Sequence, residues 1–357
     1  MKKLSLVLAG ILMCASLVGC SQPKGSVDVE TQIEQVQEHE NIQESKSVQE
    51  EHEKGYEKLI LAETDTTVTF VDGEGNEKTL TKKPERTVVL LNSILDLWYL
   101  VGGESVARVS GESNVPPEAM NITDLGSFNK VSIEALLALE PDLVLMHTTN
   151  SQTQFADILD QNGIEWVVID ASTKAYSAFQ NNAYIFSKIL GTEDLFEEKV
   201  MPVVEKCEGI IERAKENKEH PSVAVLYSTS KEIKVDTDDS SIGEMTSLLG
   251  VENIVKPEDI VVEGETRVAF SFEKLIEADP DYILISTMGD VEGVKAKIAK
   301  DLESNPAWNA LTAVQNDEVH YLPKDLFVYK PNARYDEAFA YLEEIFLRKK
   351  PNNENGF

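Results

Sequence analysis

Histidine and cysteine, the side chains that most often bind transition metals or act as nucleophiles, are few and scattered, with five histidines and three cysteines in this chain of 357 residues. A zinc or manganese receptor would gather three histidines and a carboxylate at one point. Here His147 ends an expected strand, His220 precedes one and His320 lies within one, so these side chains are not expected to meet. The chain also has no Gly-x-Gly-x-x-Gly, P-loop or Gly-x-Ser-x-Gly sequence. We therefore expect no metal centre, no resident cofactor and no enzymatic activity.

Cys20 is the residue whose position predicts a covalent modification. It follows two lysines, an apolar run over residues 4–13 and the stretch Leu17-Val18-Gly19. This is the layout of an export signal, and the run is too short for a lasting membrane span. The ending resembles the lipobox of bacterial lipoproteins, which implies that residues 1–19 are a signal peptide and that Cys20 carries a diacylglycerol. The alternative is an ordinary signal peptide with a chance cysteine.

Lipidation at Cys20 would anchor the mature protein to the cell membrane on its extracytoplasmic face. Cys14 would leave with the signal, so that Cys207 would be the one free thiol and no disulfide could form within a molecule. The formal net charge of −30 makes nucleic acid a poor partner. Residues 20–64 are rich in Glu, Gln, Ser and Lys, which is typical of a flexible tether, although a transient helix is an open alternative.

Short, continuously apolar runs after the tether indicate strands of parallel sheets that helices cover on both faces. One series lies within residues 65–191, and a second lies within residues 220–350, ahead of a tail over 351–357. Residues 192–219 have apolar side chains at helical spacing, which predicts one long amphipathic helix. We expect an α/β fold with two pseudo-symmetric α/β lobes joined by this helix. The alternative is one continuous sheet with a long surface helix.

A repeated unit supports the two-lobe interpretation. Residues 131–145 align with residues 270–284, and each copy has a serine at the expected start of a short helix. Each copy then has an acid-Pro-Asp turn that ends the helix and begins a buried strand. Matching units of this kind predict lobes related by pseudo-symmetry.

These repeats, the connecting helix, the sequence Asn305-Pro306-Ala307-Trp308 and the sequence Tyr335-Asp336-Glu337-Ala338 together resemble one family. It is the iron-complex and vitamin B12 class of ABC-transporter substrate-binding proteins. The resemblance implies a class III periplasmic-binding-protein-like fold with a rigid helix between the lobes and a ligand cleft. It also implies a monomer that captures a small-molecule iron complex and delivers it to an ABC permease dimer with its ATPase.

In this family the glutamate of each repeated unit docks onto arginines of the permease. The matching residues are Glu134 and Glu273, each in the first turn of a short helix, where the helix dipole favours a negative charge. The alternative is a capping-box glutamate that binds its own backbone.

Ligands of open α/β sheets bind beside the loops that follow the carboxyl ends of strands. This rule nominates several loops, among them residues 327–334. Arginine, lysine and tyrosine side chains there suit an anionic ferric siderophore, which we expect as the ligand, because arginine forks onto two oxygens. Each could instead be an ordinary surface side chain. The predicted ligand-binding residues are Asn92, Ser93, Asn129, Lys130, His147, Tyr227, Arg267, Met288, Tyr329 and Arg334.

Haem is the alternative ligand, with cobalamin as another possibility within the family. Residues 241–245 and Met288-Gly289 are similar to haem-binding lipoproteins of the family, whose axial ligands are a first-lobe methionine and a second-lobe histidine. This chain has Asn129 and Met288 at those positions, so the pair is not reproduced. Met288 could still bind iron, with His147 opposing it from the first lobe, or Met288 could simply pack in the cleft wall.

Overall fold

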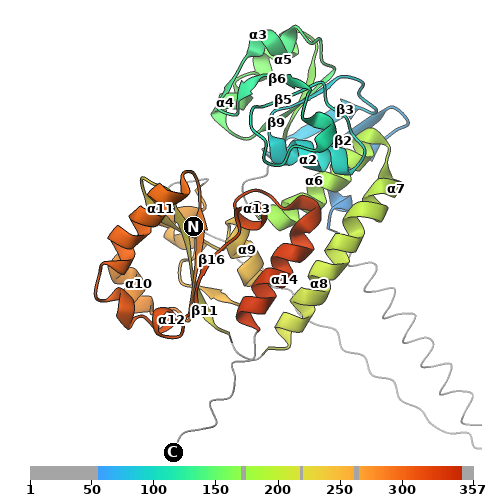
Figure 1. Cartoon of the computed structure of the whole chain (residues 1–357). Coiled ribbons are helices and arrows are strands. Elements are labelled where there is room, and N and C mark those ends of the chain that lie inside the picture. Colours follow the sequence, from blue (N-terminus) through green and yellow to red (C-terminus); the bar gives the residue numbers. More distant parts are fainter. Residues whose placement is uncertain (1–54, 170–173, 218–219, 261–264, 348–357) are drawn as a thin grey trace, which may run out of the picture. The chain divides into compact units, whose positions relative to one another are not determined.

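The structure, a computed structural model, describes residues 55–169, 174–217, 220–260 and 265–347 (Figure 1). The predicted signal peptide 1–19, Cys20, the tether as far as residue 54 and the tail 351–357 lie outside the described residues. Within the described part, no helix is both long enough and apolar enough to cross a membrane.

The folded part of the chain begins before residue 65, so the prediction of a tether as far as residue 64 is wrong at its end. Strand β1 (Ile60–Glu63) pairs antiparallel with β2 (Thr67–Val71), which in turn pairs with β3 (Glu77–Thr81). The Tyr56 ring is buried and lies 5.3 Å from the ring of Phe196, centroid to centroid. Pairing and aromatic burial, both supplied by residues distant in sequence, order a segment whose composition alone indicates a tether.

The first lobe contains a parallel sheet of five strands. The order across it is β10 (Glu165–Ile169), β9 (Leu143–His147), β4 (Thr87–Val89), β5 (Ala107–Arg108) and β6 (Thr123–Asp124). The chain leaves β4 toward β5 on one side and returns to β9 on the other. Such a reversal leaves a crevice at the carboxyl ends of the two central strands, which is where α/β proteins place ligands.

A pair of short strands and several helices complete this lobe beside its sheet. Two-residue strands β7 (Gly126–Ser127) and β8 (Lys130–Val131) form an antiparallel pair. The helices are α2 (Asn92–Leu100), α3 (Ile133–Leu137), α4 (Asn150–Thr153), α5 (Ala156–Gln161) and α6 (Ala175–Leu190).

The second lobe has its own sheet, in which parallel and antiparallel strands are mixed. The order is β14 (Arg267–Ala269), β12 (Ile233–Asp236), β11 (Ser222–Ser228), β15 (Tyr282–Thr287) and β16 (Val319–Tyr321), with β13 (Glu252–Asn253) beside the start of β11. Because the two large sheets are separate, the alternative of one continuous sheet is wrong. The main helices here are α9 (Ser241–Leu248), α10 (Phe272–Ala278), α11 (Val291–Ile298), α12 (Thr312–Gln315), α13 (Lys324–Phe327) and α14 (Tyr335–Phe346).

The two copies of the repeated unit fold alike. Ser132 and Ser271 cap α3 and α10 by accepting hydrogen bonds from backbone amides three residues later, each over 3.3 Å. Asp142 and Asp281 then accept hydrogen bonds from the backbone at or near the start of the neighbouring strand, Asp142 from Arg86 and Asp281 from Ser222. The two lobes therefore share the matching units that the repeat predicts.

The helical link between the lobes is interrupted near its start. It consists of α7 (Glu193–Leu195), a π-helical stretch over Phe196–Val200 and α8 (Met201–Lys215). Pro202 lacks the amide hydrogen that would bond to the carbonyl of Glu198, and the π-helical turns lie just before it. The predicted single helix is thus a continuous helical path with a changed pitch over its first turns.

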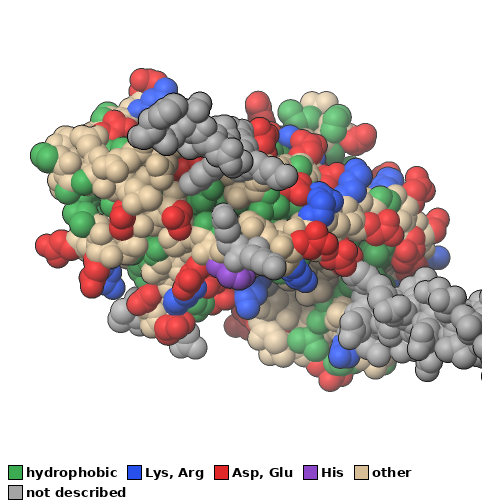
Figure 2. Space-filling view, turned by 90° about the horizontal axis from the view of Figure 1, so that it is seen from below, with side chains coloured by type: hydrophobic (Ala, Val, Ile, Leu, Met, Phe, Trp, Pro, Cys, Tyr) green, Lys and Arg blue, Asp and Glu red, His purple; other side chains and the backbone are tan. Residues whose placement is uncertain are grey.

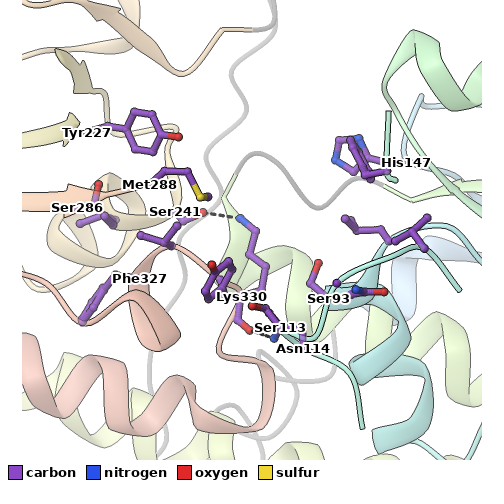
Figure 3. A pocket seen from close by; sticks show the side chains of 18 of the residues that line it. Ser93, Ser113, Asn114, His147, Tyr227, Ser241, Ser286, Met288, Phe327 and Lys330 are labelled. Carbon is purple, nitrogen blue, oxygen red and sulfur yellow. Dashed lines mark hydrogen bonds between the residues drawn. The ribbon is translucent and has the colours of Figure 1, made fainter. Parts of the chain in front are cut away.

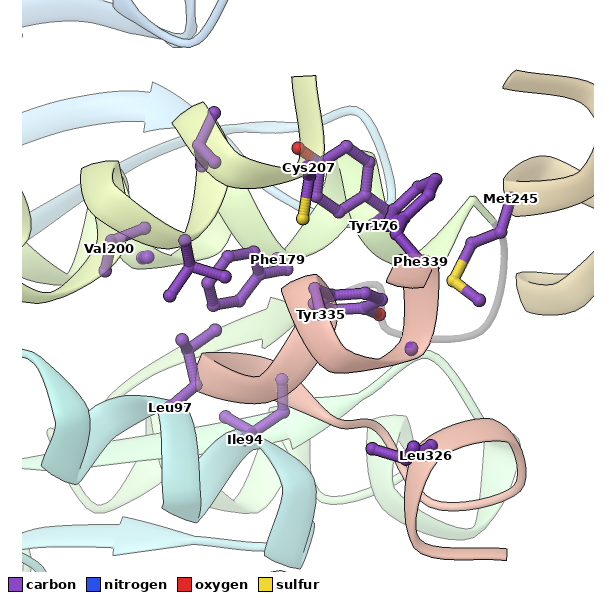
Figure 4. Packing of buried hydrophobic residues seen from close by; sticks show 14 of the residues in the cluster. Ile94, Leu97, Tyr176, Phe179, Val200, Cys207, Met245, Leu326, Tyr335 and Phe339 are labelled. Carbon is purple, nitrogen blue, oxygen red and sulfur yellow. The ribbon is translucent and has the colours of Figure 1, made fainter. Parts of the chain in front are cut away.

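A buried cluster packs α8 against α6 and α14 (Figures 1 and 4). Tyr176 packs against Tyr335 and Phe339 of α14, with ring centroids 5.2 and 4.9 Å away, and Cys207 lies beside it in Figure 4. Ion pairs outside the cluster join α8 and α14, with Arg213 Nε 2.8 Å from Glu343 Oε1. This apolar core extends into both lobes, which supports a stiff connection between them.

Acidic side chains are spread over the face of the molecule shown in Figure 2, and lysine and arginine side chains lie among them. No continuous basic surface of the kind that binds nucleic acid is seen on the described part of this face.

Candidate functional site

A cavity of about 500 Å³ lies between the lobes (Figure 3). The volume is within the range of roughly 300–1,000 Å³ that small-molecule sites have. Residues of the first lobe that line it are Leu91, Asn92, Ser93, Val109, Ser110, Gly111, Glu112, Ser113, Asn114, Phe128 and His147. Residues of the second lobe that line it are Tyr227, Asp236, Ser241, Ile242, Arg267, Ser286, Met288, Phe327, Val328, Tyr329 and Lys330.

The first-lobe wall forms where the sheet order reverses. Asn92 and Ser93 begin α2 just after β4, and His147 ends the adjacent strand β9. The side chain of Gln152 is fully buried and joins the two strand ends, because it accepts from His147 N over 2.7 Å and donates to Leu90 O over 2.7 Å. His147 is thereby held at the crevice that the sheet topology creates.

A loop over residues 109–114 forms the rest of this wall, and the buried side chain of Arg108 holds it. The guanidinium donates to the carbonyl oxygens of Val109 and Gly111 over 2.9 and 2.8 Å. It also donates to Ala119 O and Met120 O, each over 3.1 Å. Backbone carbonyls, rather than a carboxylate, therefore satisfy this buried cation, and they come from the loop itself and from residues 119 and 120 beyond it.

The second-lobe wall follows the carboxyl ends of β11 and β15. Tyr227 lies near the end of β11, and Met288 follows β15 with its amide donating to Ser228 O over 3.0 Å. Arg267 on β14 forms an ion pair with Asp236 on β12. Burial raises the pKa of the Asp236 carboxyl, although the arginine acts in the opposite direction. Burial also raises the pKa of the Tyr227 phenol.

A segment between α13 and α14 runs between the lobes and contacts both. Lys330 donates from Nζ to Ser241 Oγ over 2.6 Å, and its carbonyl accepts from Asn114 Nδ2 over 2.6 Å (Figure 3). Asn332 is buried and donates to Ser93 O and Asp96 Oδ2 over 2.9 and 2.8 Å. The cavity floor is therefore built by hydrogen bonds from both lobes to one short segment.

Seven of the ten predicted ligand residues line this one cavity. They are Asn92, Ser93, His147, Tyr227, Arg267, Met288 and Tyr329.

The other three predicted ligand residues, Asn129, Lys130 and Arg334, do not line the cavity. Arg334 is exposed and pairs with Asp325 and Glu337 over 2.9 and 2.8 Å, contacts that raise its pKa. Asn129 and Lys130 lie in and after the turn between β7 and β8, where Lys130 is exposed. A contact of these three residues with a ligand therefore stays a prediction that the lining of this cavity does not support.

Several lining or supporting residues lacked a usable signal in the sequence. Asp236 ends β12, whose residues Ile-Lys-Val-Asp alternate between apolar and polar and so do not form the continuous apolar run that marks the other strands. The strand-end rule nominates Lys330 only as one residue of the loop 327–334 and does not single it out. Arg108 is the second residue of a two-residue strand that is too short to carry a pattern.

The proposed docking glutamates are both exposed and lie in the first turns of α3 and α10. Neither lines the cavity. The amide of Ser132, which a capping-box glutamate would bind, donates instead to Leu125 O over 2.8 Å. The capping-box alternative for Glu134 is therefore not formed.

Comparison with known proteins gives the family. Residues 88–326, which include most of both lobes, match the family described as periplasmic binding protein. The chain belongs to this family. The resemblance seen in the sequence and the two-lobed α/β fold are thus confirmed.

Two curated relatives of this family member are each 25% identical to it. The match to the uncharacterized ABC transporter substrate-binding lipoprotein YvrC of Bacillus subtilis spans 281 residues, 78% of this chain and 84% of the relative. The match to the high-affinity heme uptake system protein IsdE of Staphylococcus aureus spans 266 residues, 74% of this chain and 87% of the relative.

Solved structures agree with the fold of this periplasmic binding protein. S. aureus IsdE complexed with heme has a TM-score of 0.63 and 22% identity, over 73% of this chain and 98% of that one. S. aureus SirA complexed with staphyloferrin B has a TM-score of 0.62 and 18% identity, over 78% of this chain and 97% of that one.

No group of three or more histidine, cysteine or acidic side chains that could hold a metal ion occurs in the described part of the chain.

Proposed function

We propose that this chain is the substrate-binding protein of an ABC importer and that it captures haem, as cargo, in the cavity between the lobes. The observation that carries the proposal is the pair His147 and Met288, which line the same cavity from opposite lobes (Figure 3). Imidazole and thioether are both axial ligands of haem iron in proteins. The pair has the residue types described for haem receptors of the family, with the lobes exchanged.

Aromatic and apolar side chains support a flat ligand between these two residues. Phe128 packs edge-on against His147, with ring centroids 5.5 Å apart, and Tyr227, Phe327 and Tyr329 line the opposite wall. Rings of this kind stack on or pack edge-to-face against a macrocycle.

The charge of the lining also favours haem over the siderophore expected from the sequence. Two cations, Arg267 and Lys330, line the cavity together with two carboxylates, Glu112 and Asp236. A strongly anionic ferric siderophore would require an excess of positive charge, which this balanced set does not supply. Haem needs cations only near its propionates.

The comparisons support an iron complex without choosing between its kinds. IsdE is named as a heme uptake protein and SirA was solved with staphyloferrin B, so both kinds of ligand occur on this fold. A ferric siderophore remains the second candidate, because Arg267 lies against Tyr227 as a donor pair suited to anionic oxygens.

The decisive experiment is a titration of the purified protein with haem, a panel of ferric siderophores and cobalamin. We expect tightest binding to haem, with a Soret shift that reports axial ligation. His147→Ala and Met288→Ala should each change the Soret spectrum and together weaken binding by at least about tenfold. His320→Ala and Met120→Ala, which change the same residue types outside the cavity, are the matched controls. Tighter binding of a siderophore, or a Soret spectrum unchanged in the double variant, would contradict the proposal.

We further propose that the protein is held on the extracytoplasmic face of the membrane by a lipid on Cys20. It would deliver its cargo to an ABC permease and ATPase through Glu134 and Glu273. The exposure of both glutamates at matching positions of the two lobes supports this role.

A further inference from the structure

We propose that Asp236 is a positioning residue that holds Arg267 ready to receive a carboxylate of the ligand. The inference rests on the proposed function, since in haem that carboxylate is a propionate. Beyond the proposed function, it states that the propionate contacts Arg267 in the second-lobe wall and that the buried carboxylate of Asp236 positions this arginine.

The two side chains come from neighbouring antiparallel strands. Asp236 on β12 is directly opposite Arg267 on β14 in the register of the sheet. The Asp236 side chain is almost fully buried, and its Oδ1 accepts a hydrogen bond from Nε of Arg267. Asp236 lines the cavity but exposes only 1% of its side chain, so we expect its contact with the arginine to persist when the cavity is filled.

Tyr227 restrains the same guanidinium from a third strand. The central guanidinium carbon of Arg267 lies 4.1 Å from the centroid of the Tyr227 ring. A cation over an aromatic face is held there by the ring quadrupole. The carboxylate and the ring together restrict the rotation of a side chain that would otherwise be flexible.

The terminal amino groups of Arg267 are left for the ligand. Among the described residues, none accepts a hydrogen bond from Nη1 or Nη2 of Arg267, whereas Nε donates to Asp236 Oδ1. The side chain is 34% exposed and lines the cavity. Two parallel amino groups in a fixed plane match the two oxygens of a carboxylate.

Arg334 shows how a different environment excludes this role. Its guanidinium uses Nε and Nη2 on Glu337 and Nη1 on Asp325, so acidic side chains occupy the whole fork. Asp236 accepts a hydrogen bond only from Nε of Arg267, so the two terminal amino groups of Arg267 stay available to a ligand.

The test compares haem with haem dimethyl ester, in which the propionates carry no charge. We expect the wild-type protein to bind haem at least about tenfold more tightly than the ester. Arg267→Met should abolish this preference. Asp236→Asn should reduce it several-fold while affinity for the ester stays unchanged. Arg334→Met, an arginine change outside the cavity, should leave the preference intact.

A purely structural role for Asp236 would lower the affinities for haem and for the ester alike, and that result would overturn the inference. Tyr227→Leu provides a second test that leaves the buried carboxylate in place, should Asp236→Asn fail to fold, and it should also reduce the preference. Equal binding of haem and ester by the wild type would overturn the inference but leave the proposed function standing. Binding of neither would overturn the proposed function, and this inference with it.

Discussion

The buried carboxylate of Glu244 in the second lobe caps the amino terminus of α6 in the first lobe through Ser177. Glu244 Oε1 accepts from the backbone amide of Ser177 over 3.1 Å and also from its hydroxyl. The other carboxylate oxygen accepts from the amide of Tyr176 over 2.8 Å. A helix cap is usually local in sequence, but here the cap joins residues that lie 67 and 68 positions apart and links the two lobes.

Replacing Glu244 should therefore destabilise the whole domain. We expect Glu244→Ala to lower the free energy of unfolding by about 2–4 kcal/mol, because it leaves the buried amide of Tyr176 and the partly buried amide of Ser177 without an acceptor. Urea denaturation measures the change. The control is Glu273→Ala at an exposed site, which should stay within about 0.5 kcal/mol of the wild type. An equally small change for Glu244→Ala would show that water replaces the cap.

Arg108 should control the shape of the first-lobe wall. Arg108→Met removes the donors that hold the 109–114 loop to residues 119 and 120, so we expect haem affinity to fall by about tenfold through loss of preorganisation. Calorimetric titration, at a temperature where circular dichroism shows the variant folded, measures the effect. Arg213→Met, at an exposed ion pair on α8, should bind haem normally. Unchanged affinity in Arg108→Met would mean that the loop keeps its shape unaided.

Cys207 should be inert toward thiol reagents while the protein is folded. Burial raises the pKa of its thiol to about 12, so almost no thiolate forms at pH 8. A chromogenic disulfide reagent should label the Cys20→Ser protein slowly in buffer and rapidly in urea. Rapid labelling of the folded protein would contradict the burial.

The same raised pKa predicts how stability changes with pH. The folded state keeps the Cys207 thiol neutral, whereas the unfolded chain ionises near its ordinary pKa of about 8.5. The contribution of this group is therefore fully present below that value and is lost as pH rises above it. Unfolding in urea at pH 7 and pH 10 should show a smaller alkaline loss in Cys207→Ala than in the wild type.

Glu134 and Glu273 should matter for uptake and not for binding. Because both lie outside the cavity, the double change to alanine should leave haem affinity unchanged, whereas uptake by cells should fall sharply as docking charge is lost. Glu292→Ala, an exposed first-turn acid on α11, is the control. Normal uptake in the double variant would leave these carboxylates without a docking role.

Cys20 should determine where the protein is found. Cys20→Ser should release it to the medium or leave an uncleaved precursor, because two acyl chains are needed for stable anchoring. Fractionation with an antibody against the folded domain measures this. Unchanged membrane retention would refute lipidation at Cys20.

Features that depend on neighbours along the chain could be read from the sequence. The repeated units are defined by a capping serine, a short helix and a proline stop, all within fifteen residues, so their form follows from local rules. The strand-end rule placed His147, Tyr227 and Met288 at the cleft, because the carboxyl end of a buried parallel strand is recognisable before its partners are known.

Features that depend on partners from elsewhere in the chain were decided only by the tertiary structure. Arg267 and Arg334 are chemically identical, yet one meets a buried aspartate and an aromatic ring in the cavity, while the other is occupied by exposed acids. The strand β1 exists because β2 offers it an unpaired edge, which its own acidic surroundings do not reveal. Local patterns determine most of the elements, although not β1. Which side chains meet is set by packing between residues far apart in sequence, and this packing places Arg267 in the cavity lining and Arg334 outside it.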